Sequence, residues 1–64
     1  MTTSDAITRL KELSEDNTDM ANRLEAENLI NDERMTRLIR TYRWWSQCLS
    51  MAAWLLEEDA NGNV

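Results

Sequence analysis

The chain has 64 residues, carries a formal net charge of −5, and contains no proline, no histidine and one cysteine. A chain this short forms at most one domain, residues 1–64, and buries only about 60% of the surface it exposes when unfolded. Cys48 alone cannot form an intramolecular disulfide, and without histidine the chain lacks good ligands for structural zinc. We therefore expect no metal or cofactor, and we expect oligomerisation to supply the missing burial.

Charge and hydropathy also narrow the class of partner. The acidic balance argues against direct nucleic-acid binding and favours a protein partner. The apolar-rich run 44–56 contains Ser46, Gln47 and Ser50 and is shorter than the roughly 20 residues of a bilayer span. The N-terminus lacks the segments of a signal peptide, and a lone thiol fits a reducing compartment. We expect a cytoplasmic protein that does not cross a membrane.

The first predicted helix covers residues 4–30. Thr3 or Ser4 can cap its start, with Asp5 in the first turn, where a negative charge suits the helix dipole. Apolar side chains recur at spacings of three, four and seven, as on one face of a helix. They are Ile7, Leu10, Leu13, Met20 and Leu24.

A turn is predicted near residue 31, because Asn31 or Asp32 is a good N-cap for a second helix over residues 32–58. Residues 59–64 are predicted to be a frayed tail. The apolar positions of the second helix alternate in steps of three and four, as in a heptad repeat. They are Met35, Leu38, Tyr42, Trp45, Leu49, Ala52 and Leu56. A single long helix is the alternative, since no glycine or proline breaks the chain before Gly62.

A register test favours the hairpin. If the chain folds back near Asn31, position 16 lies opposite position 46, the two apolar stripes meet, and the arginines of residues 34–43 lie beside the acidic first helix. We therefore predict an all-α fold, an antiparallel helical hairpin of two long helices. Its predicted core or oligomer residues are Leu10, Leu13, Met20, Leu24, Leu38, Tyr42, Trp45 and Leu49.

Asn17 would face Trp45 in this register and interrupt the apolar seam. It is interpreted either as a buried polar residue that specifies register or as part of a local break in the first helix, with Thr18 capping a second segment.

The second helix has more apolar surface than one neighbour covers. A second row holds Trp44, Cys48, Met51 and Leu55, and Trp54 lies on a third face, while Cys48 is interpreted as small core packing. The simplest arrangement is a homodimer that pairs second helices in a four-helix bundle. The tryptophans are then either bundle core or a docking site for another protein.

Two sets of residues are candidates for that docking. The first has the composition of interface hot spots: Arg40, Arg43, Trp44, Met51 and Trp54. The second is an acidic face that either solvates its helix or imitates a phosphate backbone in a basic groove of another protein: Glu12, Glu15, Asp16 and Asp19.

Catalysis is not expected, because the chain has no histidine, no glycine-rich phosphate loop and no nucleophile motif. In size, acidity and helix content the chain is similar to short interaction proteins of phages and other mobile elements. That general likeness implies a stoichiometric inhibitor or modulator of a host regulator or defence complex. Two alternatives remain open. One is a structural coiled-coil or assembly subunit, and the other is a peripheral membrane effector that binds lipid through residues 34–45.

Overall fold

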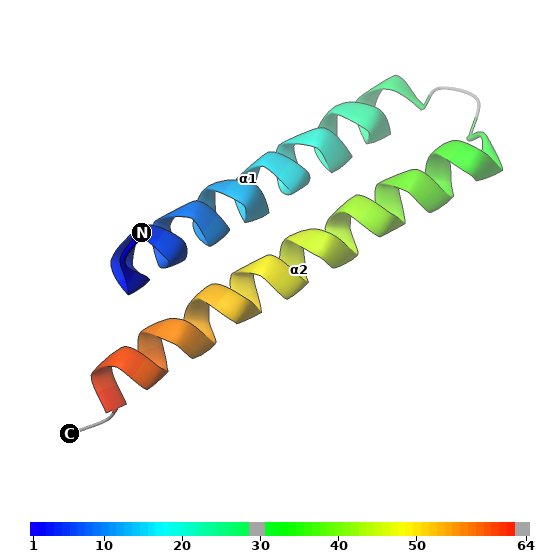
Figure 1. Ribbon diagram of the computed structural model, residues 1–64. Coiled ribbons are helices and arrows are strands. Elements are labelled where there is room, and N and C mark those ends of the chain that lie inside the picture. Colours follow the sequence, from blue (N-terminus) through cyan, green and yellow to red (C-terminus); the bar gives the residue numbers. More distant parts are fainter. Residues whose placement is uncertain (29–30, 63–64) are drawn as a thin grey trace.

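The computed structural model describes residues 1–28 and 31–62. They form two α-helices, α1 (Thr3–Glu27) and α2 (Glu33–Gly62), which run antiparallel and side by side (Figure 1). The predicted helical hairpin is confirmed, and a single continuous helix is not formed. α1 ends at Glu27, earlier than predicted, and the predicted helical residues 29–30 lie outside the described residues. Residues 59–62, predicted as a frayed tail, continue α2, while residues 63–64 also lie outside the described range.

A capping box begins α1. The Thr2 hydroxyl accepts a hydrogen bond from the Asp5 amide, and the Asp5 carboxylate accepts one from the Thr2 amide, each at 3.1 Å. The cap is therefore Thr2, just before the predicted Thr3 or Ser4. The Thr2 amide and, after it, the Thr2 hydroxyl lower the pKa of Asp5 below its ordinary value of 3.8. These two bonds satisfy amide groups that a helix start otherwise leaves unpaired.

The turn forms without glycine or proline. Asn28 ends α1, and its side-chain oxygen accepts a hydrogen bond from the Asp32 amide at 3.0 Å. Asn31 has a φ of 56°, a left-handed conformation that asparagine tolerates better than most residues. Asp32 then accepts a hydrogen bond from the Arg34 amide at 2.9 Å, which caps the start of α2. Asp32 is thus the one of the two predicted caps, Asn31 or Asp32, that makes the capping hydrogen bond.

The helices meet along one row of each. Both rows repeat in alternating steps of three and four, the spacing of two helices that pack along their length. The inner row of α1 is Ile7, Leu10, Ser14, Asn17, Ala21, Leu24 and Asn28, and that of α2 is Met35, Ile39, Tyr42, Ser46, Leu49, Ala53 and Leu56. Every member of these rows is buried or half-buried. Of the predicted core residues, Leu10, Leu24, Tyr42 and Leu49 lie in these rows, while Leu13 and Met20 lie beside them and are half-buried. Small side chains occupy the middle of the contact.

Leu38 and Trp45 were predicted to line this contact, and that prediction is wrong. They are 45% and 50% exposed, because α2 turns Ile39 and Ser46 toward α1 in their place. The predicted and the observed inner rows of α2 share Met35, Tyr42, Leu49 and Leu56. They differ by a shift of one residue at every second position. Cys48, interpreted from the sequence as core packing, is also exposed in the hairpin.

A cluster of three hydroxyl groups bridges the helices at mid-length. Ser46 is 7% exposed, its hydroxyl lies 3.2 Å from that of Ser14 and 2.5 Å from that of Thr18, and it donates to the Ser14 carbonyl at 3.0 Å. The Ser14 hydroxyl donates in turn to the Ser46 carbonyl at 2.9 Å. Buried polar groups paired in this way avoid the cost of an unmade hydrogen bond.

The same hydroxyl cluster shows which residues of α1 and α2 lie opposite each other. Ser46 bonds to Ser14 and Thr18, which lie on either side of position 16, the position predicted to be opposite it. Asn17 instead donates to the Leu13 carbonyl of its own helix at 2.7 Å, and α1 continues through residues 14–18 without a break. The predicted segment cap at Thr18 is therefore wrong, since Thr18 is an interhelical hydrogen-bonding residue.

We predict that close helix packing makes Ala21 intolerant of a larger side chain. Ala21 is fully buried, so Ala21→Leu should lower the free energy of unfolding by about 1–3 kcal/mol. The matched control is Ala26→Leu, an exposed position of the same helix, which should change it by no more than about 0.5 kcal/mol. Urea denaturation followed by circular dichroism, at one protein concentration, measures both. Equal effects of the two substitutions would contradict the observed face of α1.

The capping box predicts a pH dependence at the start of α1. Because the folded-state pKa of Asp5 is lowered, its contribution to stability is present above its unfolded-state pKa and is lost as pH falls through the folded value. An NMR titration of the Asp5 carboxyl carbon should give a midpoint below 3.8, with the Thr2 amide shifting in parallel. Thr2→Ala should move the midpoint back toward 3.8, since it removes the hydroxyl. A midpoint at or above 3.8 in the unmodified chain would show that the box does not form.

Candidate functional site

One side of the hairpin is ionic. In an antiparallel pair, the residues that come just after the start of each four-residue step of the inner row lie on the same side of the hairpin. Lys11 pairs there with Glu57, and Arg43 with Glu25. These partners are all more than one-third exposed, so each pair contributes about 0–1 kcal/mol and serves orientation more than stability. Of the four arginines predicted to lie beside the acidic first helix, Arg43 pairs across the interface, whereas Arg37 pairs with Glu33 of its own helix.

The opposite side is apolar. On α1 the residues that come just before the end of each four-residue step of the inner row lie on this side. Ala6, Leu13 and Met20 are half-buried there, and Glu27 is exposed. On α2 this side continues through a second row, also spaced by three and four, which we name the flank row. It consists of Leu38, Thr41, Trp45, Cys48, Ala52 and Leu55. No member of this row is charged, and all but Ala52 are exposed.

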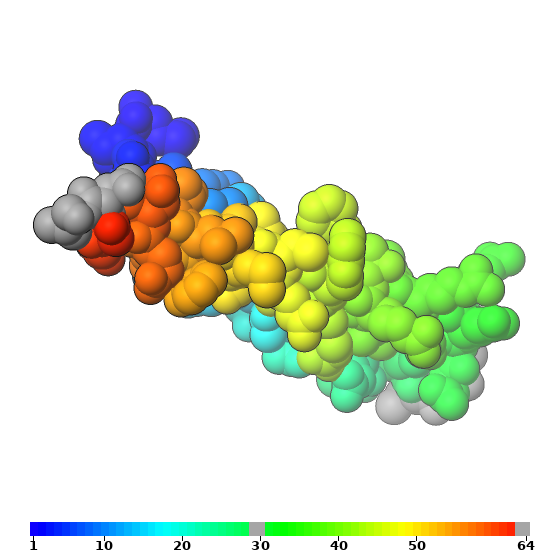
Figure 2. Space-filling model, turned by 90° about the horizontal axis from the view of Figure 1, so that it is seen from below, coloured from blue at the N-terminus to red at the C-terminus, as the bar shows by residue number. Residues whose placement is uncertain are grey.

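A third row covers the part of α2 that is turned away from α1, and we name it the outer row. Figure 2 shows this surface of α2, which runs from green to orange across the view and hides most of α1. Trp44, Met51 and Trp54 are 58%, 63% and 57% exposed on it. The whole outer row is Arg37, Arg40, Trp44, Gln47, Met51 and Trp54. Large apolar groups so exposed are uncommon on soluble monomers unless a partner covers them.

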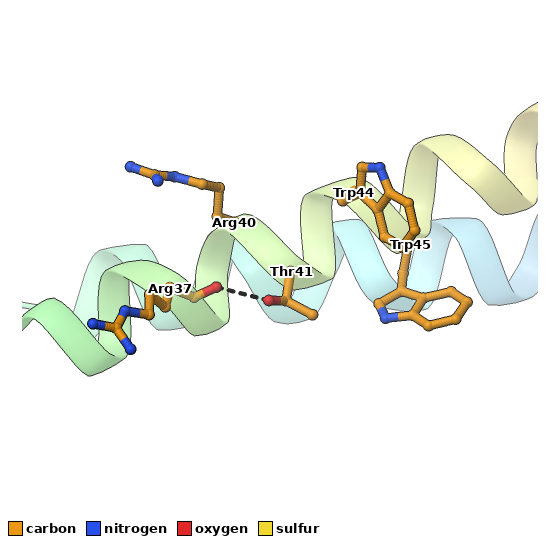
Figure 3. Close-up of a pocket in the computed structure, with 5 residues that line it drawn as sticks. All are labelled: Arg37, Arg40, Thr41, Trp44 and Trp45. Atoms are coloured by element: carbon orange, nitrogen blue, oxygen red, sulfur yellow. Dashed lines mark hydrogen bonds between the residues drawn. The ribbon is translucent and has the colours of Figure 1, made fainter.

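In the N-terminal half of these rows, the two adjacent tryptophans line a shallow hollow. The indole rings of Trp44 and Trp45 have centroids 5.4 Å apart and an interplanar angle of 71°, an edge-to-face arrangement. Arg37, Arg40 and Thr41 line the rest of the hollow, and Figure 3 shows the two arginines extending away from the rings. Thr41 donates its hydroxyl to the Arg37 carbonyl at 2.9 Å, so its methyl group is free to make apolar contacts.

A second hollow lies toward the ionic side, between the two helices. The hydroxyl cluster of Ser14, Thr18 and Ser46 lies at one side of it, and Met51 and Trp54 at the other. Its lining therefore offers both hydrogen-bonding and apolar groups beside the outer row.

The predicted acidic face is on the other outer surface. Glu12, Glu15, Asp16 and Asp19 are all exposed and lie on the side of α1 turned away from α2. The structure thus places the two predicted binding surfaces back to back, so one flat partner surface does not meet both.

The predicted hot-spot residues do not all belong together. Arg40, Trp44, Met51 and Trp54 share the outer row, whereas Arg43 lies on the ionic side with Glu25. The sequence analysis missed Arg37 and Gln47, which complete the outer row, and Thr41, which completes the flank row. Their three-and-four spacing with the tryptophans is the signal that could have found them.

Comparison of the chain with protein-family models, with curated proteins and with solved structures finds no match in any of the three. Over residues 1–28 and 31–62, neither helix is long and apolar enough to span a bilayer.

Proposed function

We propose that this protein is a dimeric helical binding module that acts stoichiometrically, as an inhibitor or modulator of another protein. The observation that carries the proposal is the outer row of α2. Trp44, Met51 and Trp54 are each more than half exposed on it, with Arg40 on the same face. Tryptophan and arginine are enriched among residues that dominate binding energy, and methionine adapts to irregular partner surfaces.

The same proposal includes a homodimer in which two hairpins form a four-helix bundle. Among the described residues of the single hairpin only Ala21, Ile39, Ser46 and Ala53 are buried, which is little core for a stable domain. The apolar side offers the surface that a second hairpin would cover. A binding module of this kind needs no catalysis and no cofactor, and we place it in the cytoplasm. The exposed acidic face supports solubility there.

The proposed dimer predicts a specific molar mass in solution and a substitution that converts it to a monomer. Light scattering coupled to size exclusion should give about 15 kDa, twice the chain mass of 7.5 kDa. Trp45→Glu should give a helical monomer, because it buries a charge in the apolar side of the dimer, while Trp45 lies outside the inner row that joins α2 to α1. Trp54→Glu, the matched change on the outer row, should leave the dimer intact. A monomer of the unmodified chain across the concentration range would disprove the bundle.

Partner binding predicts a different set of sensitive residues. The immobilised protein should capture one protein at a fixed ratio from extracts of the cells in which it acts. Trp54→Ala and Arg40→Ala should each weaken capture by about tenfold or more, as hot-spot truncations do. Arg43→Ala should have little effect, since Arg43 lies on the ionic side with Glu25.

The control variants for capture lie on the back of the hairpin. Glu15→Ala and Asp19→Ala should leave capture unchanged if the outer row binds the partner. Loss of capture in these two variants, with Trp54→Ala unaffected, would assign binding to the acidic face and contradict the proposal. A dimer that captures no protein would instead favour a structural subunit.

A further inference from the structure

The flank row of α2 is a second seam of the same kind as the inner row. Its six residues alternate in steps of three and four from Leu38 to Leu55. Each lies one residue before a member of the inner row. At 100° per residue the two seams are separated by about 100° around the helix. Neighbouring helices of a four-helix bundle are related in this way, so α2 has one seam for α1 and one for another helix.

The surface area indicates that the second seam accepts a partner of similar size. The chain exposes 5207 Å², whereas a compact monomer of 7.5 kDa would expose about 4,250 Å². The excess, about 950 Å², resembles the roughly 800 Å² that each partner contributes to a standard interface. The Cα radius of gyration of 14.8 Å also exceeds the roughly 11 Å of a compact chain of this length.

The flank row is self-complementary when two copies of α2 run antiparallel. One register pairs all six positions, and it places Leu38 against Leu55, Thr41 against Ala52, and Trp45 against Cys48 of the partner subunit. Trp45 of each subunit then packs against the small side chain of Cys48. A parallel pair would stack Trp45 on its own copy in one layer and leave two alanines in another, which packs volume unevenly.

Charges at the ends of the seam favour the same direction. In this register the side chains of Arg37 and Glu58 converge from opposite subunits, once at each end of the symmetric pair. Within the described part of its own chain, Arg37 pairs with Glu33, and both side chains are largely exposed, so Arg37 can turn toward another carboxylate. A parallel pair would bring the two copies of Arg37 together. Such charge patterns select the orientation of paired helices.

The apolar side of α1 spans the level of this two-fold axis. The antiparallel register of α2 has its two-fold axis between Ser46 and Gln47. The hydroxyl cluster places this level of α2 beside residues 14–18 of α1. Leu13 and Met20, the large apolar residues on that side of α1, lie on either side of this level. The same two-fold axis therefore places the apolar side of α1 beside that of the partner subunit's α1.

We infer that a second copy of this chain binds on the flank row, with the two α2 helices antiparallel and Trp45 packed against Cys48 of the partner subunit. The inference rests on the dimer of the proposed function and adds its surface, direction and register. It also brings the outer rows of both subunits to the same side of the bundle.

Cysteine cross-linking of the intact chain tests the register. In a Cys48→Ser background, Thr41→Cys and Ala52→Cys are made singly and together. Treatment with a short bis-thiol reagent should link position 41 to position 52 between subunits, both in the double variant and in an equimolar mixture of the single variants. Each single variant alone should stay unlinked, because like positions are 11 residues, about 16 Å, apart along the helix. Mass spectrometry of the linked peptides identifies the bond.

The matched control is Ser50→Cys in the same background, on the ionic side, which should not be linked. Links between like positions, 41 to 41 and 52 to 52, would overturn the antiparallel direction. A dimer by light scattering that forms none of these links would overturn the flank row as its interface. A monomer would overturn the inference and the dimer together, and the capture experiment with Trp54→Ala would still decide whether the hairpin is a binding module.

Discussion

Close contact between two helices through small side chains is the constraint on which the rest of this structure depends. Ala21, Ser46 and Ala53 occupy inner-row positions that a larger apolar residue such as leucine could fill. The distance between packed helix axes depends on the side chains at the contact, and small ones allow the shortest approach. That approach lets the hydroxyl groups of Ser14 and Thr18 reach Ser46 across the interface. The three tryptophans and Met51 of α2 lie on its other faces.

Most of the secondary structure follows from the sequence, because the signals are local. Hydrophobic periodicity predicts two helices, and Asp32 is a recognisable cap. Asn31 shows how the chain turns without glycine, since an asparagine adopts the left-handed conformation there. The ends were less predictable. Thr2 begins α1 through a reciprocal pair of hydrogen bonds with Asp5, and α2 continues through residues that look like a helix stop.

The phase of the contact could not be predicted from hydrophobicity alone. Met35, Tyr42, Leu49 and Leu56 are common to two possible rows, one completed by Leu38 and Trp45 and the other by Ile39 and Ser46. Hydrophobicity favours the first, and the structure has the second. Polar residues at matching positions of both helices were the missing signal, because a buried hydroxyl is acceptable where it finds another hydroxyl or a carbonyl.

The choice of inner row on α2 also decides which residues share the candidate site. Turning Ile39 and Ser46 inward rotates Trp45 to the flank and leaves Trp44, Met51 and Trp54 outward, so the three tryptophans fall on two different faces. Composition alone grouped Arg43 with them, and only its ion pair with Glu25 separates it. The sequence therefore predicts which residue types form the surface, while the packing of α1 decides which of them share it.

If the protein dimerises and binds a partner as proposed, the three rows of α2 link these two equilibria thermodynamically. In the antiparallel arrangement Trp44 of each subunit lies beside Met51 of the partner subunit, so a protein that docks on the outer rows contacts both chains. Such a ligand binds the dimer in preference to the monomer and shifts the equilibrium toward it by mass action. Partner affinity must then fall when the chain is diluted below its dimer dissociation constant. A partner that contacts one outer row only would show no such dependence, because its site is complete on a single hairpin.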